Sequence, residues 1–227
     1  MFFKLFKPSA HSHELLTDGT DTHSHILPGV DDGAPDLASS LGIIRELIKR
    51  GIRRICCTPH IMLRYPQNTP ENLRNHFQHF RDNIREQLGE DSISLHLAAE
   101  YMIDEGFESA LRQPGGPLCL PERRLLAELP QYLLPDGWLD SLLSVRDLGC
   151  TPVLAHPERY HRLLSIEDIS DLTRQGIELQ GNIGSLTDFY GRHIRERAEE
   201  LRQRGLYSYW GSDSHSASMV RRLRLKP

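Results

Sequence analysis

The feature that most constrains the fold is an alternation of short apolar runs with longer amphipathic ones. Seven short runs have the pattern of buried strands, and most are separated by helical segments that end at a glycine or a turn. These runs cover residues 20–25, 53–58, 94–100, 124–130, 151–157, 176–182 and 206–213. Strands that alternate with helices form a parallel sheet or a closed barrel. The sequence therefore predicts an α/β fold, a distorted seven-stranded β/α barrel.

Two of the helical segments are marked at their ends. Apolar residues recur at helical spacing after Asp36, and Gly51 ends that pattern. Thr69 and Pro70 have the pattern of an N-cap and a first-turn proline, which predicts a long helix to about Leu88.

Histidine and acidic residues stand at the ends of most strand-like runs. They are His23, His25, His60, Glu100, His156, Asp213 and His215, and Asp32 follows in the loop after the first run. In a β/α barrel the carboxyl ends of the strands converge on one face. Imidazole and carboxylate ligands suit Zn, Mn or Fe. The pattern predicts one metal centre built from residues distant in sequence.

The charge of this ligand set indicates the substrate. Five imidazoles and three carboxylates around roughly three divalent ions would leave a net charge of about +3. A phosphate dianion together with a metal-bound hydroxide would neutralise that charge, and coordination generates hydroxide near neutral pH. Arg159 follows His156 by three residues and is predicted to contact the phosphoryl oxygens. The alternative for Arg159 is a surface salt bridge with Glu158.

The composition of the chain argues against a general nucleic-acid-binding protein and against a membrane-spanning one. A net charge of −4 gives no general attraction to nucleic acid, and no run of about 18 apolar residues predicts a membrane span. Four cysteines are predicted to be reduced structural thiols. The apolar stretch at the N-terminus is too short and too interrupted for a signal-peptide core, so a cytoplasmic location is expected. We predict a flexible tail over residues 1–19, in which His11 and His13 are not ligands, and one phosphatase domain over residues 20–227.

Several motifs together resemble a known family. They are DTHSHILPGVDDG from residue 21, TPH at 58–60, Glu100, AHPER at 155–159 and GSDSH at 211–215. This ordered set resembles the tyrosine-protein phosphatases of capsule and exopolysaccharide loci in the PHP (polymerase and histidinol phosphatase) superfamily. The resemblance spans roughly residues 20–215. It implies a TIM-like barrel with three divalent metal ions, Mn²⁺ foremost and Fe or Zn as alternatives.

The resemblance also implies roles for individual residues. His23, His25 and Asp213 would hold the first metal, and Glu100 would bridge it to a second metal held by His60 or His156. Asp32 and His215 would complete the third site. Arg159 would be catalytic, and a second catalytic arginine would be Arg221 or Arg222, which stand slightly later than the family pattern places it.

The same resemblance implies that the substrate is a phosphotyrosine protein, a bacterial tyrosine kinase that controls polysaccharide export. One alternative is a PHP phosphoesterase acting on a small phosphorylated metabolite, as in histidinol-phosphate hydrolysis. Another is a non-catalytic metal-binding module. An amidohydrolase that needs a carboxylated lysine has no candidate, because the only lysines are Lys4, Lys7, Lys49 and Lys226.

Some residues near strand ends remain open. Glu128, Gln180 and Asn182 could line the pocket or pack in the ordinary way. A thiol-type tyrosine phosphatase is not predicted, because the sixth residue after each of the four cysteines is not an arginine.

Overall fold

The computed structural model describes residue 16 and residues 19–223. The predicted flexible tail, with His11 and His13, lies almost entirely outside these residues. Among the described residues, no helix combines the length and the hydrophobicity needed to cross a membrane.

The described residues form nine strands in two sheets, and every pair of neighbouring strands is parallel. One sheet has the order β1-β2-β4, made of Thr20–Ser24, Arg54–Cys57 and Ser94–Leu97. The other has the order β3-β5-β6-β7-β8-β9, made of His60–Ile61, Glu100–Met102, Arg124–Glu128, Thr151–Ala155, Glu178–Asn182 and Tyr209–Gly211. The predicted α/β class with parallel strands is confirmed.

The predicted count of seven strands is not confirmed, because a further strand, β3, follows the run 53–58, and the run 94–100 is divided between β4 and β5. β2 and β3 are separated at Pro59, which has no N–H to donate to a ladder. β4 and β5 are separated opposite that break. Single hydrogen bonds continue across it: the Ala98 amide donates to the Cys57 carbonyl (2.9 Å) and the Glu100 amide to the Pro59 carbonyl (3.1 Å).

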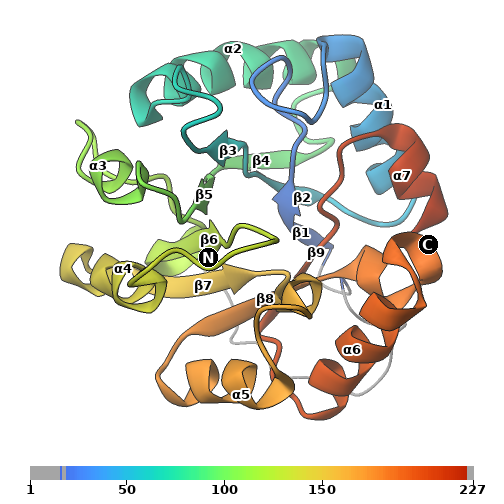
Figure 1. Cartoon of the computed structure of the whole chain (residues 1–227). Helices are drawn as coiled ribbons and strands as arrows, with labels where there is room; N and C mark the ends of the chain where they lie inside the picture. The colour runs from blue at the N-terminus through green and yellow to red at the C-terminus, as the bar shows by residue number, and fades with distance from the viewer. Residues whose placement is uncertain (1–15, 17–18, 224–227) are drawn as a thin grey trace.

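The outer strands of the two sheets approach each other, so the strands curl around a common interior. A parallel bridge joins Ser24 to Ser214. The Asp213 amide donates to the His23 carbonyl (2.8 Å), and the His25 amide donates to the Ser214 carbonyl (3.1 Å). Figure 1 shows the strands in the middle of the molecule with the helices around them. This curl brings residues from the two ends of the sequence together.

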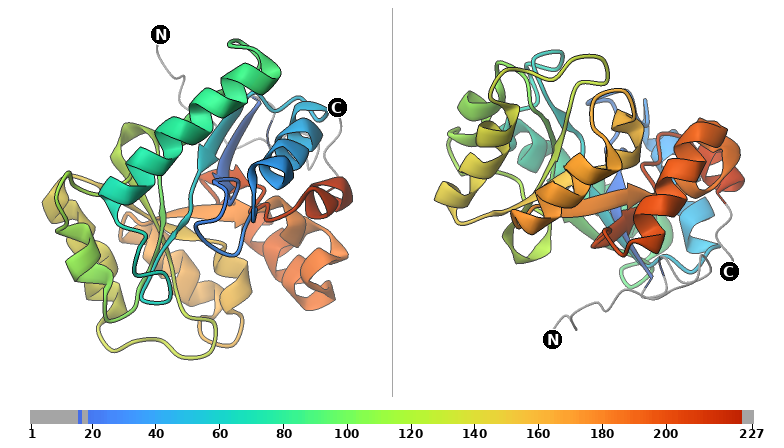
Figure 2. Two further views of the ribbon diagram at one scale, coloured as in Figure 1. Left: turned by 90° about the horizontal axis from the view of Figure 1, so that it is seen from above. Right: turned by 60° about the horizontal axis from the view of Figure 1, so that its bottom comes forward.

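Seven α-helices cover the outside of the strands in the described part, as the turned views also show (Figure 2). They are α1 Leu37–Ile48, α2 Pro70–Leu88, α3 Phe107–Leu111, α4 Trp138–Ser144, α5 Ile166–Arg174, α6 Arg192–Gln203 and α7 Ala217–Arg222. Short 3₁₀ helices are η1 Pro121–Arg123, η2 Val145–Leu148, η3 Pro157–Tyr160, η4 Ile183–Leu186 and η5 Asp188–Tyr190. The two helices predicted from their end signals are confirmed as α1 and α2, with side-chain N-caps from Asp36 and Thr69.

The interior of the curl is filled by small and medium apolar side chains. They are Cys56, Ala98, Leu120, Leu126, Val153 and Ala155. Side chains alternate along a strand, so Glu100 and Glu128 point to the same side as Ala98 and Leu126. The acidic residues therefore lie one step beyond a dry apolar layer, at the carboxyl ends of the strands.

Candidate metal centre

The structure brings all the predicted metal ligands into one connected group at the carboxyl ends of the strands. Each has a nitrogen or oxygen within 4 Å of another member of the set. His23 belongs to β1. His60 and Glu100 follow the carboxyl ends of β2 and β4, where they are the first residues of the short strands β3 and β5. The others lie in the loops that leave β1, β7 and β9: His25, Asp32, His156, Asp213 and His215.

Glu100 is at the centre of this group. Its Oε2 lies 3.2 Å from Nε2 of His23, 3.3 Å from Nε2 of His25 and 3.3 Å from Nδ1 of His60. Its Oε1 lies 2.9 Å from Nε2 of His156. Burial would raise the pKa of Glu100, but the charge of His23 and the hydrogen bonds of the imidazoles hold that pKa well below its usual range. A buried carboxylate among four imidazoles has the ligand types that divalent metal ions such as Zn, Mn and Fe prefer.

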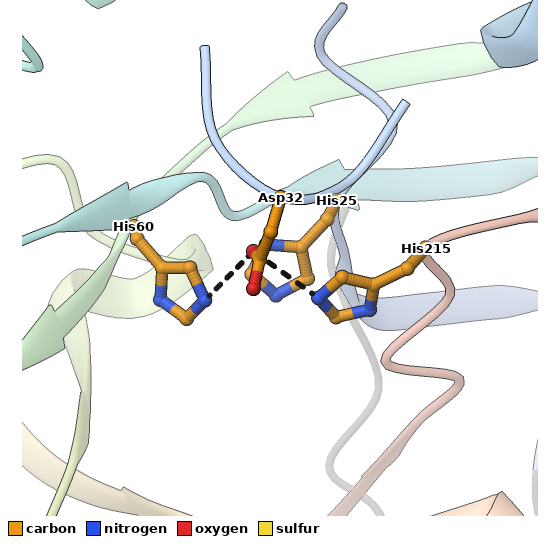
Figure 3. A group of neighbouring side chains, drawn as sticks. All are labelled: His25, Asp32, His60 and His215. Atoms are coloured by element: carbon orange, nitrogen blue, oxygen red, sulfur yellow. Dashed lines mark ion pairs between the residues drawn. The ribbon is translucent and has the colours of Figure 1, made fainter. Parts of the chain in front are cut away.

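A second cluster lies toward the solvent and is drawn in Figure 3. It contains His25, Asp32, His60 and His215, whose ligand atoms lie within 4.8 Å of one another. Oδ1 of Asp32 is 3.4 Å from Nε2 of His60 and 3.5 Å from Nε2 of His215. Asp32 is about half exposed, whereas His25 is fully buried. The outer edge of the centre, at Asp32 and His215, is therefore in contact with solvent.

A third cluster adds Glu128, one of the residues that the sequence left open. Oε1 of Glu128 lies 3.1 Å from Nδ1 of His60, and these two residues form a potential metal site with Glu100. Both of those buried atoms lack a hydrogen-bond partner among the described residues. Buried polar atoms without partners are costly, so a divalent cation with imidazole and carboxylate ligands fits here.

The protonation of His60 agrees with cation binding. Burial and the charge of His25 lower the pKa of His60, but the nearby carboxylates of Asp32, Glu128 and Glu100 raise it overall to about 10. A proton on this ring occupies the place where a metal ion would bind. Metal binding should therefore release protons.

Other side chains support the ligands from outside. Oε1 of Gln180 lies 2.8 Å from Nδ1 of His23, and the side-chain Nδ2 of Asn182 donates to Oδ2 of Asp213 (2.6 Å). Gln180 and Asn182 were the open positions at the end of β8. Asp31, which was not among the predicted ligands, lies 2.9 Å from Nδ1 of His25. The signal that could have found it is the pair of adjacent acids after the HxH motif.

The backbone around the ligands is unusually constrained. His156 and Asp213 have positive φ angles of 34° and 51°. Such a conformation costs roughly 1–3 kcal/mol per residue and is concentrated at functional sites. A Cβ atom at Gly33 would lie 2.1 Å from the His25 carbonyl oxygen, and one at Gly211 would lie 2.4 Å from Cβ of His23. Only glycine permits the chain to pass so close to the two histidines.

Arg159 lies at the edge of the same group. Its Nη1 is 3.3 Å from Oδ2 of Asp213, and its guanidinium is 5.3 Å from the centre of the Tyr190 ring. The alternative of a surface salt bridge with Glu158 is wrong. Glu158 is fully buried, and its carboxylate accepts hydrogen bonds from the Asn182 amide and the Tyr207 hydroxyl.

Arg221 and Arg222 are in α7, and their contacts lie away from the ligands. Arg221 is 3.9 Å from Glu46 of α1. The Arg222 guanidinium is 4.7 Å from the centre of the Phe189 ring. Phe189 packs edge-on against Tyr190, the residue beneath Arg159. Arg222 is therefore linked to Arg159 through two aromatic rings rather than through the ligands.

Comparison with known proteins gives a consistent assignment. The family described as "Capsular polysaccharide synthesis, CpsB/CapC" matches residues 19–226. Tyrosine-protein phosphatase YwqE of Bacillus subtilis is 29% identical over 199 residues, which cover 86% of this chain and 77% of the relative. Tyrosine-protein phosphatase CpsB of Streptococcus pneumoniae is 27% identical over 202 residues, which cover 86% of this chain and 82% of the relative.

Solved structures agree in fold. One chain, from crystal structures of YwqE from Bacillus subtilis and CpsB from Streptococcus pneumoniae, described as unique metal-dependent tyrosine phosphatases, aligns with a TM-score of 0.79 and 27% identity. The alignment covers 88% of this chain and 81% of that one. A histidinol phosphate phosphatase from Lactococcus lactis aligns with a TM-score of 0.55 at 18% identity, over 89% of each chain, and shares the fold.

Proposed function

Because the chain belongs to the CpsB/CapC family of capsular polysaccharide synthesis, we propose that it is a metal-dependent phosphatase that hydrolyses phosphotyrosine in proteins. The observation that carries this proposal is the position of Glu100 among four imidazoles, with Arg159 at the edge of the group. Bound cations and an adjacent arginine would together attract a phosphate anion and stabilise the negative charge that develops during its hydrolysis.

The proposed centre holds three divalent metal ions, with Mn²⁺ first and Fe or Zn as alternatives. Its ligands are His23, His25, Asp32, His60, Glu100, His156, Asp213 and His215, and the contact of Glu128 with His60 adds that carboxylate to the set. When bound, such ions supply Lewis-acid charge and make water a nucleophile near neutral pH. The curled sheet is then a distorted seven-stranded barrel, in which β2 with β3 and β4 with β5 each count as one strand.

The protein side chains position the phosphoryl group. The Arg159 guanidinium can donate two parallel hydrogen bonds to phosphoryl oxygens, and its contact with Asp213 orients it toward the metal ligands. The Tyr190 ring supports its other side. We assign Arg159 as catalytic. Arg221 and Arg222 are retained as candidates for the second arginine, although reaching the phosphate requires α7 to shift or their side chains to turn.

The leaving group favours phosphotyrosine as the substrate. A phenol has a pKa near 10, far below that of the alcohol released from phosphoserine. A strong general acid is therefore not needed, and positive charge at the phosphate supplies most of the stabilisation.

The proposed partner is a bacterial tyrosine kinase that controls capsule or exopolysaccharide production. Large exposed apolar side chains lie on the loops after β3 and β6, the strands that carry His60 and Glu128; these side chains are Leu63, Tyr132 and Leu133. They offer contact area to the polypeptide around a phosphotyrosine. A cytoplasmic location is part of the same proposal, because tyrosine phosphorylation uses ATP inside the cell.

The test is steady-state kinetics of metal-loaded protein on a panel of a phosphotyrosine peptide, a phosphoserine peptide of the same sequence, an aryl phosphate and histidinol phosphate. We expect the aryl phosphate and phosphotyrosine to be cleaved much faster than phosphoserine. Equal rates on the two peptides would remove the leaving-group argument. A preference for histidinol phosphate would indicate the small-metabolite phosphatase instead, and no turnover of any substrate would indicate a non-catalytic metal-binding module.

A further inference from the structure

We propose that Asp31 is a positioning residue, which holds the His25 ring so that its Nε2 faces the metal centre. This inference rests on the proposed metal centre, but it concerns a residue outside the ligand set. Oδ2 of Asp31 lies 2.9 Å from Nδ1 of His25, and both side chains are fully buried. Nε2 of the same ring lies 3.3 Å from Glu100 and 3.4 Å from Asp213.

The two nitrogens of His25 therefore face different partners. A carboxylate can only accept a hydrogen bond, so it requires the hydrogen of a neutral His25 ring to be on Nδ1. The lone pair is then on Nε2, which points at the ligand cluster. Histidine ligands to metals commonly donate their outer N–H to a carboxylate in this way, and loss of that partner costs metal affinity.

Asp31 is itself held in place by the backbone. Its Oδ1 accepts a hydrogen bond from the Gly33 amide (2.9 Å), and its Oδ2 accepts one from the His60 amide (3.0 Å). The same carboxylate thus links the ring of one ligand to the backbone of another. Because Gly33 passes so close to the His25 carbonyl, the loop has little freedom to shift.

His23 gives an internal contrast. Its outer nitrogen, Nδ1, meets the neutral side-chain oxygen of Gln180 at 2.8 Å instead of a carboxylate. Both rings are oriented by a hydrogen bond, but only the His25 ring also has a negative charge behind it. A carboxylate makes the ring a stronger donor to a metal ion than an amide does. His25 belongs to two of the candidate ligand groups, His23–His25–Glu100 and His25–Asp32–His60–His215, and its Nε2 can donate its one lone pair to a metal ion in either of them.

A purely structural role would predict a different result, and the chain offers a matched control for it. Asp104 braces a loop with the same geometry: Oδ1 accepts from the Gly106 amide (2.8 Å) and Oδ2 accepts from the Leu63 amide (2.9 Å). No contact of Asp104 with a metal ligand is found among the described residues. Asp104→Asn therefore changes a side chain that only stabilises a loop. Asp31→Asn changes a side chain that stabilises a loop and also contacts the ring of His25.

The experiment measures Mn²⁺ affinity of the full chain after stripping with a chelator, together with the Co²⁺ absorption spectrum and the unfolding temperature. We expect Asp31→Asn to weaken metal binding by about 10- to 100-fold and to alter the Co²⁺ spectrum at saturation. Asp104→Asn should bind metal like the wild type. Wild-type affinity in Asp31→Asn would overturn the proposal, and so would an equal loss in Asp104→Asn.

A second variant covers a failure of Asp31→Asn to fold. Asp31→Glu keeps the charge but moves the carboxylate by one methylene group. Weakened metal binding in folded Asp31→Glu supports positioning, and unchanged binding and spectrum overturn it. Wild-type protein that binds Mn²⁺ without phosphatase turnover would refute the proposed function alone, since the role of Asp31 is measured by metal binding.

Discussion

Charged side chains are arranged differently at the amino and carboxyl ends of the strands. At the amino ends of β6 and β8, Arg124 pairs with Glu122 (2.6 Å) and Glu178 (2.7 Å) and stacks over Tyr209. These groups are partly exposed and neutralise one another. Glu128 at the carboxyl end of β6 and Glu100 just beyond the carboxyl end of β4 are buried among imidazoles. The first arrangement is complete within the chain, whereas the second is completed by a cation from outside.

The difference indicates which charged groups require a ligand and which do not. A carboxylate paired with arginine at the surface contributes little free energy and requires no ligand. A buried cluster of carboxylates and imidazoles is costly to form. The positive φ angles of His156 and Asp213 add backbone strain at the same end. A fold retains such an arrangement where function requires it.

Removal of metal is the strongest test of this comparison. Treatment with a strong chelator should abolish phosphatase turnover, because the carboxyl-end cluster has no internal replacement for the cations. Restoring Mn²⁺, Zn²⁺ or Fe²⁺ should recover it, as measured by steady-state rates and metal analysis. Full activity in protein shown to be free of metal would contradict the mechanism.

Loss of Arg159 should give the next largest effect. Arg159→Ala removes a positive charge beside the proposed phosphate site, so kcat/KM should fall by roughly 10²- to 10³-fold while metal content stays unchanged. Kinetics and metal analysis of the purified variant measure this. An Arg159→Ala enzyme as active as the wild type would reduce this arginine to a surface role.

An arginine at the other end of the strands sharpens the contrast. Arg124→Ala should leave kcat/KM within about twofold of the wild type, because Arg124 neutralises only acids at the amino ends. Its loss should instead reduce the free energy of unfolding by about 1 kcal/mol through the lost ion pairs and stacking on Tyr209. Thermal unfolding and kinetics of the same preparation separate these effects. A large drop in turnover would mean that the two ends are coupled.

The same contrast explains what the sequence could predict. The proximity of His60 and Glu100 was predictable because a β/α pattern places strand ends on one face, whichever strands are neighbours. The interruption between β2 and β3 and the one between β4 and β5 depend on hydrogen bonds between strands. The spacing of apolar residues in the sequence does not reveal these bonds. The partners of His23 and His25 were harder still. Gln180 lies 157 residues from His23, and Asp31 is identified by the ring nitrogen it contacts.

The cysteines provide the smallest expected effect. Burial raises the pKa of Cys56 to about 12, and burial also raises the pKa of Cys57 well above its usual range. Cys119 and Cys150 lie at the amino ends, with their sulfur atoms 3.5 Å apart, and burial raises the pKa of Cys119 to about 12. A thiol acts as a nucleophile only as a thiolate, so none of these three is prepared to attack a phosphate.

Replacing Cys56, Cys57 and Cys150 by alanine and Cys119 by serine should therefore leave kcat/KM within about twofold, with a stability loss of about 1 kcal/mol for each buried site. The measurements are phosphatase kinetics, metal content and the unfolding temperature of each single variant. Lower stability with normal turnover is expected, because these side chains fill the interior and the amino ends rather than the metal centre. Lost turnover with normal stability and metal content would show that a thiol takes part in the chemistry, and the division between the two ends of the strands would then fail.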